Sequence, residues 1–179
     1  VTDGVFTAFG PGLAQQYEAQ GGDLAAIEVV DLGGKLVCPP FCDTHLHLDY
    51  VFTARKPGAV NESGTLFEGI QRWSETKSDL TVDEIKQRAK IGIKKEMLHG
   101  VQLIRSHADV TDPNLTSLKA LLELKEELKD TVTLQIVSFP QEGMYSYEGP
   151  HGESGAELVE EGLKMGADCV GGIPHFEQC

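Results

Sequence analysis

Two histidines separated by one residue, His45 and His47, are the side chains of this sequence best suited to bind a metal ion. They follow the apolar run 35–41, which predicts a β-strand. Side chains alternate along a strand, so both imidazoles point to one side and the residue between them points to the other. A half-exposed surface strand could carry the same pair. The neighbouring Asp43-Thr44 and Leu48-Asp49 add carboxylates at the strand's end, and this setting favours a metal site.

From Lys35 onward, apolar strands, polar loops and amphipathic helices alternate, which is typical of β/α units around a parallel sheet. Each expected strand ends in polar or ionisable residues. The expected strands are residues 36–41, 101–104, 132–137 and 169–173. Four helices are expected, and two of them begin near Leu66 and near Leu115. The helix that starts at the capping box of Thr81 and Glu84 is expected to stop at Gly100, and the helix that starts at the capping box of Ser154 and Glu157 is expected to stop at Gly166.

This pattern indicates the α/β fold class and, within it, a (β/α)8 barrel whose catalytic groups lie at the carboxyl ends of the strands. A complete barrel takes about 250 residues, so residues 35–179 correspond to its first four β/α units, about half of it. A doubly wound open sheet is the second interpretation, because no Gly-x-Gly-x-x-Gly turn follows the first strand. Residues 1–34 carry short apolar pieces at Val5-Phe6 and 27–30, broken by glycines, and predict short strands and turns.

The composition limits the kinds of partner that the chain can bind. The chain has 179 residues and a net charge of -13, which argues against nucleic acid or an anionic membrane as partner. We see no apolar run of membrane-spanning length, no secretory signal after Val1 and no starting Met, which fits a chain whose first residues are missing. The four cysteines, Cys38, Cys42, Cys169 and Cys179, do not form a disulfide framework, so we expect a reducing, cytoplasmic setting. We interpret Cys38 and Cys42 as buried small hydrophobic residues and not as zinc ligands.

The segment Asp43-Thr44-His45-Leu46-His47-Leu48-Asp49 resembles the first-strand motif of the amidohydrolase superfamily. Further segments resemble, in the same order, the bacterial cytosine deaminase branch of that superfamily, and the resemblance covers nearly all of residues 35–179. The motif Phe139-Pro140-Gln141-Glu142-Gly143 is the most specific of them. The others are residues 63–70, 107–110, 134–137 and 173–177. The resemblance implies a metal-dependent amidohydrolase barrel, preceded in residues 1–34 by part of a small N-terminal β-sandwich domain.

The resemblance also implies a reaction, the hydrolytic deamination of cytosine to uracil and ammonia in pyrimidine salvage, by a hydrolase acting on C–N bonds of cyclic amidines. One divalent metal ion, Fe(II) or Zn(II), would activate water and would be held by His45, His47, a third histidine and an aspartate. Gln141 would bind the pyrimidine edge, because an amide offers both a donor and an acceptor. The other ligands and the catalytic groups are expected beyond Cys179, so this fragment alone is expected to be inactive. We expect a homo-oligomer when the protein is full length.

Other interpretations stay open. Gln141 could be a turn residue, His107 a hydrogen-bonded barrel histidine, and His175 a brace of the fourth strand, although we favour pocket lining for both histidines. Asp49 is expected to orient a loop or a neighbouring histidine, and His99 and His151 are expected to face solvent.

His175-Phe176-Glu177 matches half of the zinc nucleoside-deaminase signature, but the Pro-Cys-x-x-Cys half is absent. The alternative functions are an aminohydrolase acting on another ring, such as isocytosine, creatinine or a triazine, and a non-catalytic fragment. The setting of Gln141 favours cytosine among the rings.

Overall fold

The computed structural model describes residues 1–177 and divides the chain into two compact units, Val1–Cys38 and Pro39–Cys179. The first unit contains a short helix, α1 (Leu13–Ala19), and a 3-10 helix, η1 (Leu24–Ala26). Its only extended pairing within the described residues is an isolated bridge between Thr2 and Val5. The prediction of strands at Val5-Phe6 and 27–30 is therefore wrong, because the described residues include no neighbouring strand with which these segments could pair. A small β-sandwich domain over residues 1–34 stays a prediction.

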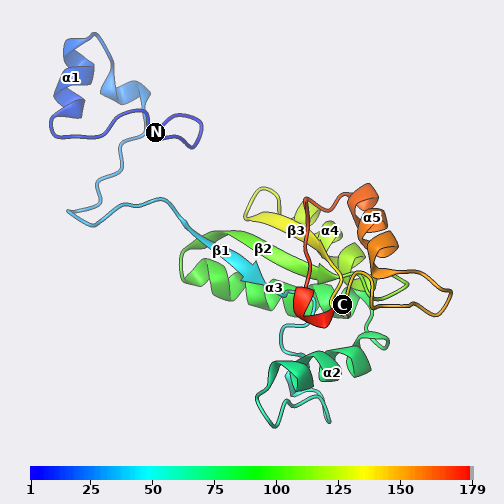
Figure 1. The fold of residues 1–179 in the computed structure, drawn as a ribbon. Coiled ribbons are helices and arrows are strands. Elements are labelled where there is room, and N and C mark those ends of the chain that lie inside the picture. The colour runs from blue at the N-terminus through cyan, green and yellow to red at the C-terminus, as the bar shows by residue number, and fades with distance from the viewer. Residues whose placement is uncertain (178–179) are drawn as a thin grey trace. The chain divides into compact units, whose positions relative to one another are not determined.

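The second unit is built on a parallel sheet whose strands follow the order of the chain, β1-β2-β3-β4 (Figure 1). The strands are β1 (Phe41–Leu46), β2 (Val101–Asp109), β3 (Thr133–Phe139) and β4 (Cys169–Val170). Sequential order is what successive β/α units of a barrel produce, whereas a doubly wound sheet reverses its order at a switch point. The sheet order therefore supports the barrel over the doubly wound alternative.

The strand bounds differ from the predicted ones. β1 begins at Phe41, because Leu36 and Val37 are exposed and are not in a strand. β2 continues through its polar end as far as Asp109, since each residue from Leu103 onward pairs with β3. The polar and ionisable residues that end the expected strand 101–104 thus belong to β2 itself.

All four predicted helices of the second unit form. They are α2 (Leu66–Lys77), α3 (Val82–Leu98), α4 (Thr116–Glu127) and α5 (Gly155–Met165), with short 3-10 helices η2 (Thr53–Arg55) and η3 (Pro174–Phe176). The predicted capping box of α5 is complete, and that of α3 is half formed. Thr81 accepts the Glu84 N–H at 3.2 Å, but the Glu84 carboxylate pairs with Lys56 instead. Among residues 1–177, no helix combines the length and apolar character needed to cross a bilayer.

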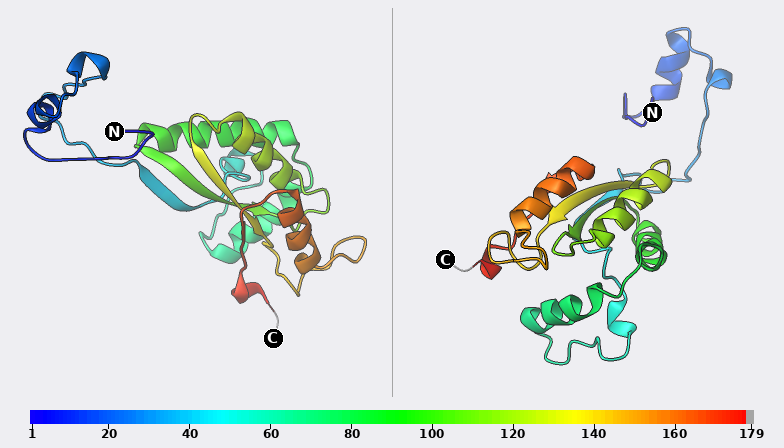
Figure 2. Two further views of the ribbon diagram at one scale, coloured as in Figure 1. Left: turned by 90° about the horizontal axis from the view of Figure 1, so that it is seen from above. Right: turned by 90° about the vertical axis from the view of Figure 1, so that its right-hand side faces the viewer.

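Helices α3, α4 and α5 cover one face of the sheet, with α3 and α4 side by side (Figure 2). Ile104 of β2 and Ile136 of β3 are fully buried beneath them. The leucines of α4 that are also fully buried are Leu118, Leu121 and Leu124. At Gly162 of α5, an added Cβ would lie 2.4 Å from the Ser138 hydroxyl, so only glycine allows this approach of α5 to β3. The core of the unit thus lies between the sheet and this helix layer.

The cysteine prediction is wrong in one respect. Cys38 and Cys42 are exposed instead of buried, because Cys38 precedes the sheet and Cys42 lies on β1, the edge strand of the described sheet. Both are free, as is the partly buried Cys169. Cys179, also named in that prediction, lies outside the described residues.

Candidate functional site

Three histidines converge at the carboxyl ends of β1 and β2. Leu46 pairs with Ser106 across the two strands, and this register brings the neighbouring His45, His47 and His107 together. The ring centroids of His45 and His107 are 4.0 Å apart. The ring centroid of His47 is 5.2 Å from that of His45 and 5.4 Å from that of His107. The strand alternation that singled out His45 and His47 thus also brings in His107 from the next strand.

His47 is held among aromatic rings. Tyr50 stacks on it with centroids 4.6 Å apart, and Phe139 meets it edge-on at 5.5 Å. Burial, followed by the charges of His107 and His45, lowers the pKa of His47 to about 4. Burial, followed by the charge of His45, also lowers the pKa of His107. Both imidazoles are therefore neutral at pH 7, the form that binds metal ions.

Unpartnered polar atoms mark this cluster and a cavity beside it. The Nδ1 atoms of His47 and His107 and the Oε1 atom of Gln141 are buried without a hydrogen-bond partner in the described part of the chain. Buried polar atoms are nearly always paired in native proteins. Of these residues, His47 and Gln141 line the cavity, so their unpaired atoms are free to bind a ligand there.

The cavity has a volume of about 660 Å³ and lies between the strand ends and α2. His45, His47 and Gln141 line it, and Gln141 is 4% exposed. The remaining lining residues are Tyr50, Asn61, Gly64, Thr65, Leu66, Gly69, Ile70, Trp73, Phe139, Gly172 and Ile173. They are mainly apolar or aromatic, which suits a flat organic ring. Sequence reasoning did not identify Tyr50, Trp73 or Phe139 as wall residues.

The two candidate lining residues, His107 and His175, are not among the side chains that line this cavity. The His107 ring lies 4.0 Å from that of His45, and His175 is an exposed residue of η3 whose ring is 5.2 Å from that of Phe67. The Glu177 carboxylate accepts the backbone N–H groups of Tyr145 and Ser146 at 3.0 and 3.2 Å, so it fixes the loop after β3. His99 and His151 are exposed, as expected.

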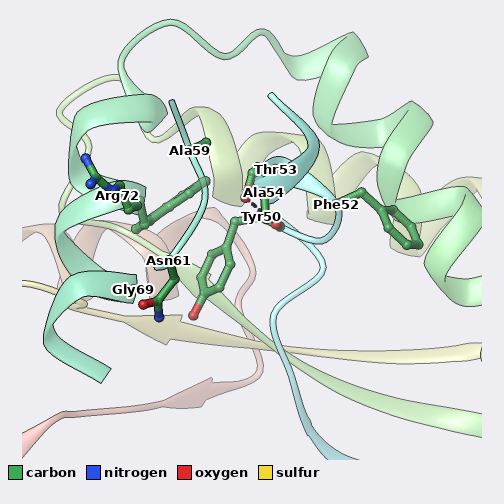
Figure 3. Close-up of a pocket in the computed structure, with 9 residues that line it drawn as sticks. Tyr50, Phe52, Thr53, Ala54, Ala59, Asn61, Gly69 and Arg72 are labelled. Atoms are coloured by element: carbon green, nitrogen blue, oxygen red, sulfur yellow. Dashed lines mark hydrogen bonds between the residues drawn. The ribbon is translucent and has the colours of Figure 1, made fainter. Parts of the chain in front are cut away.

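A smaller cavity, of about 210 Å³, adjoins the first at Tyr50 and Trp73. Figure 3 shows the Tyr50 ring beside the Asn61 amide, with the Arg72 guanidinium directed away from both. Arg72 donates to the carboxylates of Glu68 and Glu75, at 3.4 and 3.2 Å. Tyr50 and Trp73, whose ring centroids are 4.6 Å apart, are thus shared walls of the two cavities.

Asp49 has the loop-orienting role expected of it. It is fully buried and accepts the backbone N–H groups of Asp109 at 2.9 Å and of Tyr50 at 3.1 Å. Arg88 donates to the main-chain carbonyls of Asp49 and Val51 rather than to the carboxylate. Burial raises the pKa of Asp49 to about 7. The carboxyl group thus joins the segment after β1 to the end of β2.

Asp109, which sequence reasoning did not single out, joins several segments of the site. It is fully buried, and its Oδ2 accepts the indole N–H of Trp73 at 2.7 Å and the Lys77 ammonium at 3.1 Å. Its Oδ1 accepts the N–H of Thr111 at 2.8 Å and that of Gln141 at 3.3 Å. Its only signal in the sequence is that it is an acid at the end of an apolar strand.

The residues present fit one part of a metal centre. Within residues 1–177, no group of three or more histidine, cysteine, aspartate and glutamate side chains could hold a metal ion. A catalytic zinc site has three protein ligands and an open position. His45 and His47, with an unpartnered nitrogen on His47, are suited to supply two of them. The resemblance implies that the third histidine ligand and the aspartate come from later strands of the barrel, so His107 is not one of the implied ligands.

Comparison with known proteins shows the family. A model of the amidohydrolase family matches residues 28–178. Among solved structures, the chain is 47% identical to a 5-methylcytosine deaminase from Klebsiella pneumoniae liganded with phosphonocytosine, with a TM-score of 0.75, covering 87% of this chain and 38% of that one. It is 28% identical to an N-isopropylammelide isopropylaminohydrolase from Burkholderia multivorans, with a TM-score of 0.56, covering 74% of this chain and 32% of that one.

A curated relative adds to this. N-isopropylammelide isopropyl amidohydrolase from Pseudomonas sp. strain ADP is 35% identical over 148 residues, which are 80% of this chain and 36% of that protein. The chain thus spans about a third of the length of these relatives. Its parallel β/α units match part of the barrel of the solved deaminase. The chain belongs to the amidohydrolase family.

Proposed function

We propose that this chain carries part of the active site of a metal-dependent aminohydrolase that converts cytosine and water into uracil and ammonia. The observation that carries the proposal is the shared cavity of His45, His47 and Gln141, in which His47 and Gln141 each have a buried polar atom without a partner. A metal-binding pair and an amide that can bind the ring edge are two of the features that hydrolytic deamination of a pyrimidine needs. The likeness to a cytosine-type deaminase supports this substrate class.

Gln141 is the substrate-binding residue of this proposal. Its Oε1 accepts an N–H from the ring, and its Nε2 donates to a ring nitrogen or carbonyl on the same edge. Phe139 and Trp73 supply aromatic surface, and Leu66, Ile70 and Ile173 supply apolar surface. A flat pyrimidine is therefore enclosed on its faces and read along one edge.

His45 and His47 would hold one divalent ion, Fe(II) or Zn(II), which as a Lewis acid would activate water for attack on the amino-bearing carbon. Because the lowered pKa keeps the His47 ring neutral, this ring can bind the ion without releasing a proton. The remaining ligands and proton-transferring groups would come from residues outside this chain, so residues 1–179 alone are proposed to be inactive. A cytoplasmic homo-oligomer acting in pyrimidine salvage is part of the same proposal.

One alternative has an observation in its favour. The 35% identity to a hydrolase named for N-isopropylammelide favours a substituted triazine as substrate. Isocytosine and creatinine are further rings with the same type of C–N bond. The alternative from another functional class is a non-catalytic fragment. The metal content of the complete protein distinguishes it from the enzymes, which would contain a divalent ion.

The test is ammonia release by the complete protein from cytosine, 5-methylcytosine, isocytosine, creatinine and N-isopropylammelide, together with its metal content. We expect one bound divalent ion per chain, turnover of cytosine, and loss of both metal and turnover in His47→Ala. Gln141→Ala should raise the KM for cytosine, while Gln135→Ala, a glutamine of β3 that does not line the cavity, should not. Metal-loaded protein that releases no ammonia from cytosine would contradict the proposal.

A further inference from the structure

Helix α2 lies apart from the layer formed by α3, α4 and α5, beyond the strand ends (Figures 1 and 2). Its only buried side chains are Ile70 and Trp73, both of which line the larger cavity. It reaches the sheet through polar contacts, the Trp73 indole and the Lys77 ammonium, both directed at Asp109. A wall of the cavity is thus tied to the end of the sheet by hydrogen bonds and charge, in addition to the packing of Ile70 and Trp73.

Lys77 is the centre of these contacts. Its side chain is 10% exposed, and its ammonium donates to Asp109 at 3.1 Å, to the Thr111 hydroxyl at 3.0 Å and to the Glu142 carboxylate. An ammonium has three N–H donors, so all of them are used. Burial opposes the charge, but Asp109 and Glu142 outweigh it and raise the pKa of Lys77. The ammonium is therefore a fixed cation with a defined orientation.

The two carboxylates on Lys77 flank Gln141. Asp109 accepts the Gln141 N–H at 3.3 Å, and Glu142 is the next residue in the chain. The Ser74 hydroxyl of α2 also donates to Glu142, at 2.9 Å. Lys77 therefore contacts the segment of Gln141 twice, through Asp109 on the Gln141 N–H and directly at the Glu142 carboxylate, while the Gln141 side chain itself forms no hydrogen bond through Oε1.

We propose that Lys77 and Asp109 are positioning residues. They fix the Gln141 amide where it binds the edge of the substrate ring and the Trp73 side chain where it packs on the face of that ring. The inference rests on the proposed function, because it names the groups that set ring recognition in that same cavity. A buried ion pair is weak evidence for stability, since desolvation offsets its attraction. Its geometry fits a positioning role, because both of its carboxylates contact the segment that reads the ring.

A positioning role predicts coupling to Gln141. In the complete protein, Lys77→Met should raise the KM for cytosine about tenfold with a smaller change in kcat, because the amide is displaced while the metal-binding histidines are not. Lys77→Arg should recover part of the loss, since it keeps the charge. In a Gln141→Ala background, Lys77→Met should add little to KM. Asp109→Asn, which keeps the size of the side chain and removes its charge, should behave like Lys77→Met.

The matched control is Lys86→Met, which removes a lysine that is paired with Glu123 and Glu127 between α3 and α4 and lies away from the cavity. It should leave KM unchanged. Metal content and melting temperature are measured for each variant. If Lys77→Met does not fold, Thr111→Val tests the positioning role in its place. It removes the hydroxyl shared by Lys77 and Asp109 without changing a charge.

The outcomes separate the two proposals. A Gln141→Ala effect on KM without any effect of Lys77→Met or Thr111→Val would overturn the positioning role and leave the proposed function standing. Additive effects of Lys77→Met and Gln141→Ala would also overturn it, because they would show that the two residues act on KM independently. No effect of Gln141→Ala would instead count against the proposed function itself.

Discussion

Helix α4 and helix α2 are fixed to the same sheet by different forces. α4 buries three leucines completely against the strands, whereas α2 buries only Ile70 and Trp73 and is tied by the ion pairs of Lys77. Apolar burial has no preferred direction, but hydrogen bonds to a carboxylate specify orientation. The back of the sheet thus supplies stability, and the polar attachment of α2 sets the geometry of the cavity wall.

The largest expected effect is in α4. Leu121→Ala should lower the free energy of unfolding by about 2–5 kcal/mol, because it leaves a cavity under the helix layer. Urea unfolding of the complete protein measures it. Leu98→Ala is the control, since Leu98 is 74% exposed at the end of α3. A loss for Leu121→Ala no greater than that of the control would show that α4 is not fixed by its leucines.

A smaller and local effect is expected in α2. Trp73→Phe keeps an aromatic ring in the wall but removes the 2.7 Å hydrogen bond to Asp109, which costs about 1–3 kcal/mol because the acceptor is buried. Amide hydrogen exchange should speed up in α2 and stay unchanged in α4. Equal acceleration in both helices would mean that α2 belongs to the cooperative unit of the helix layer, and the contrast between them would then fail.

The helix caps should have effects of about 1 kcal/mol. Ser154→Ala removes the hydroxyl that accepts the Glu157 N–H at 3.3 Å and should destabilise α5 by that amount. Thr65→Ala removes the equivalent cap of α2, at 3.4 Å from the Glu68 N–H. Because α5 packs on β3, we expect Ser154→Ala to lower global stability and Thr65→Ala to affect only the exchange of α2. Global destabilisation by Thr65→Ala alone would reverse this ranking.

The helices of the second unit were predictable because their signals are local. Ser154, Glu157 and Gly166 delimit α5 within a short stretch of sequence, and the structure uses all three as expected. The start of β1 was not predictable, because Leu36 and Val37 are apolar yet unpaired. Whether an apolar residue enters a strand depends on the neighbouring strand, and that information is not local.

The candidate site was predictable from the sequence in the same uneven way. His45 and His47 follow from strand alternation, and Gln141 follows from its motif. The role of Asp109 depends on Trp73 and Gln141, which are 36 and 32 residues away in the sequence. Trp73, at helical spacing from Leu66 and Ile70, is equally typical of a core residue, so its indole N–H gave no signal. Contacts that distant segments form only after folding were therefore the part that the sequence did not show.

The smallest expected effect is a pH dependence in α5. The backbone N–H of Ser154, followed by its hydroxyl, donates to the Glu157 carboxylate and lowers its pKa below the ordinary 4.5. A lowered pKa means that this carboxylate adds stability at a pH above 4.5 and that the added stability is lost as the pH falls through the folded-state pKa. Glu157→Gln should therefore speed amide exchange in α5 at neutral pH, and its difference from the parent protein should shrink in acid. A difference of equal size at neutral and acid pH would show that Glu157 acts through packing and not through its charge, which would place α5 wholly in the apolar half of the comparison with α2.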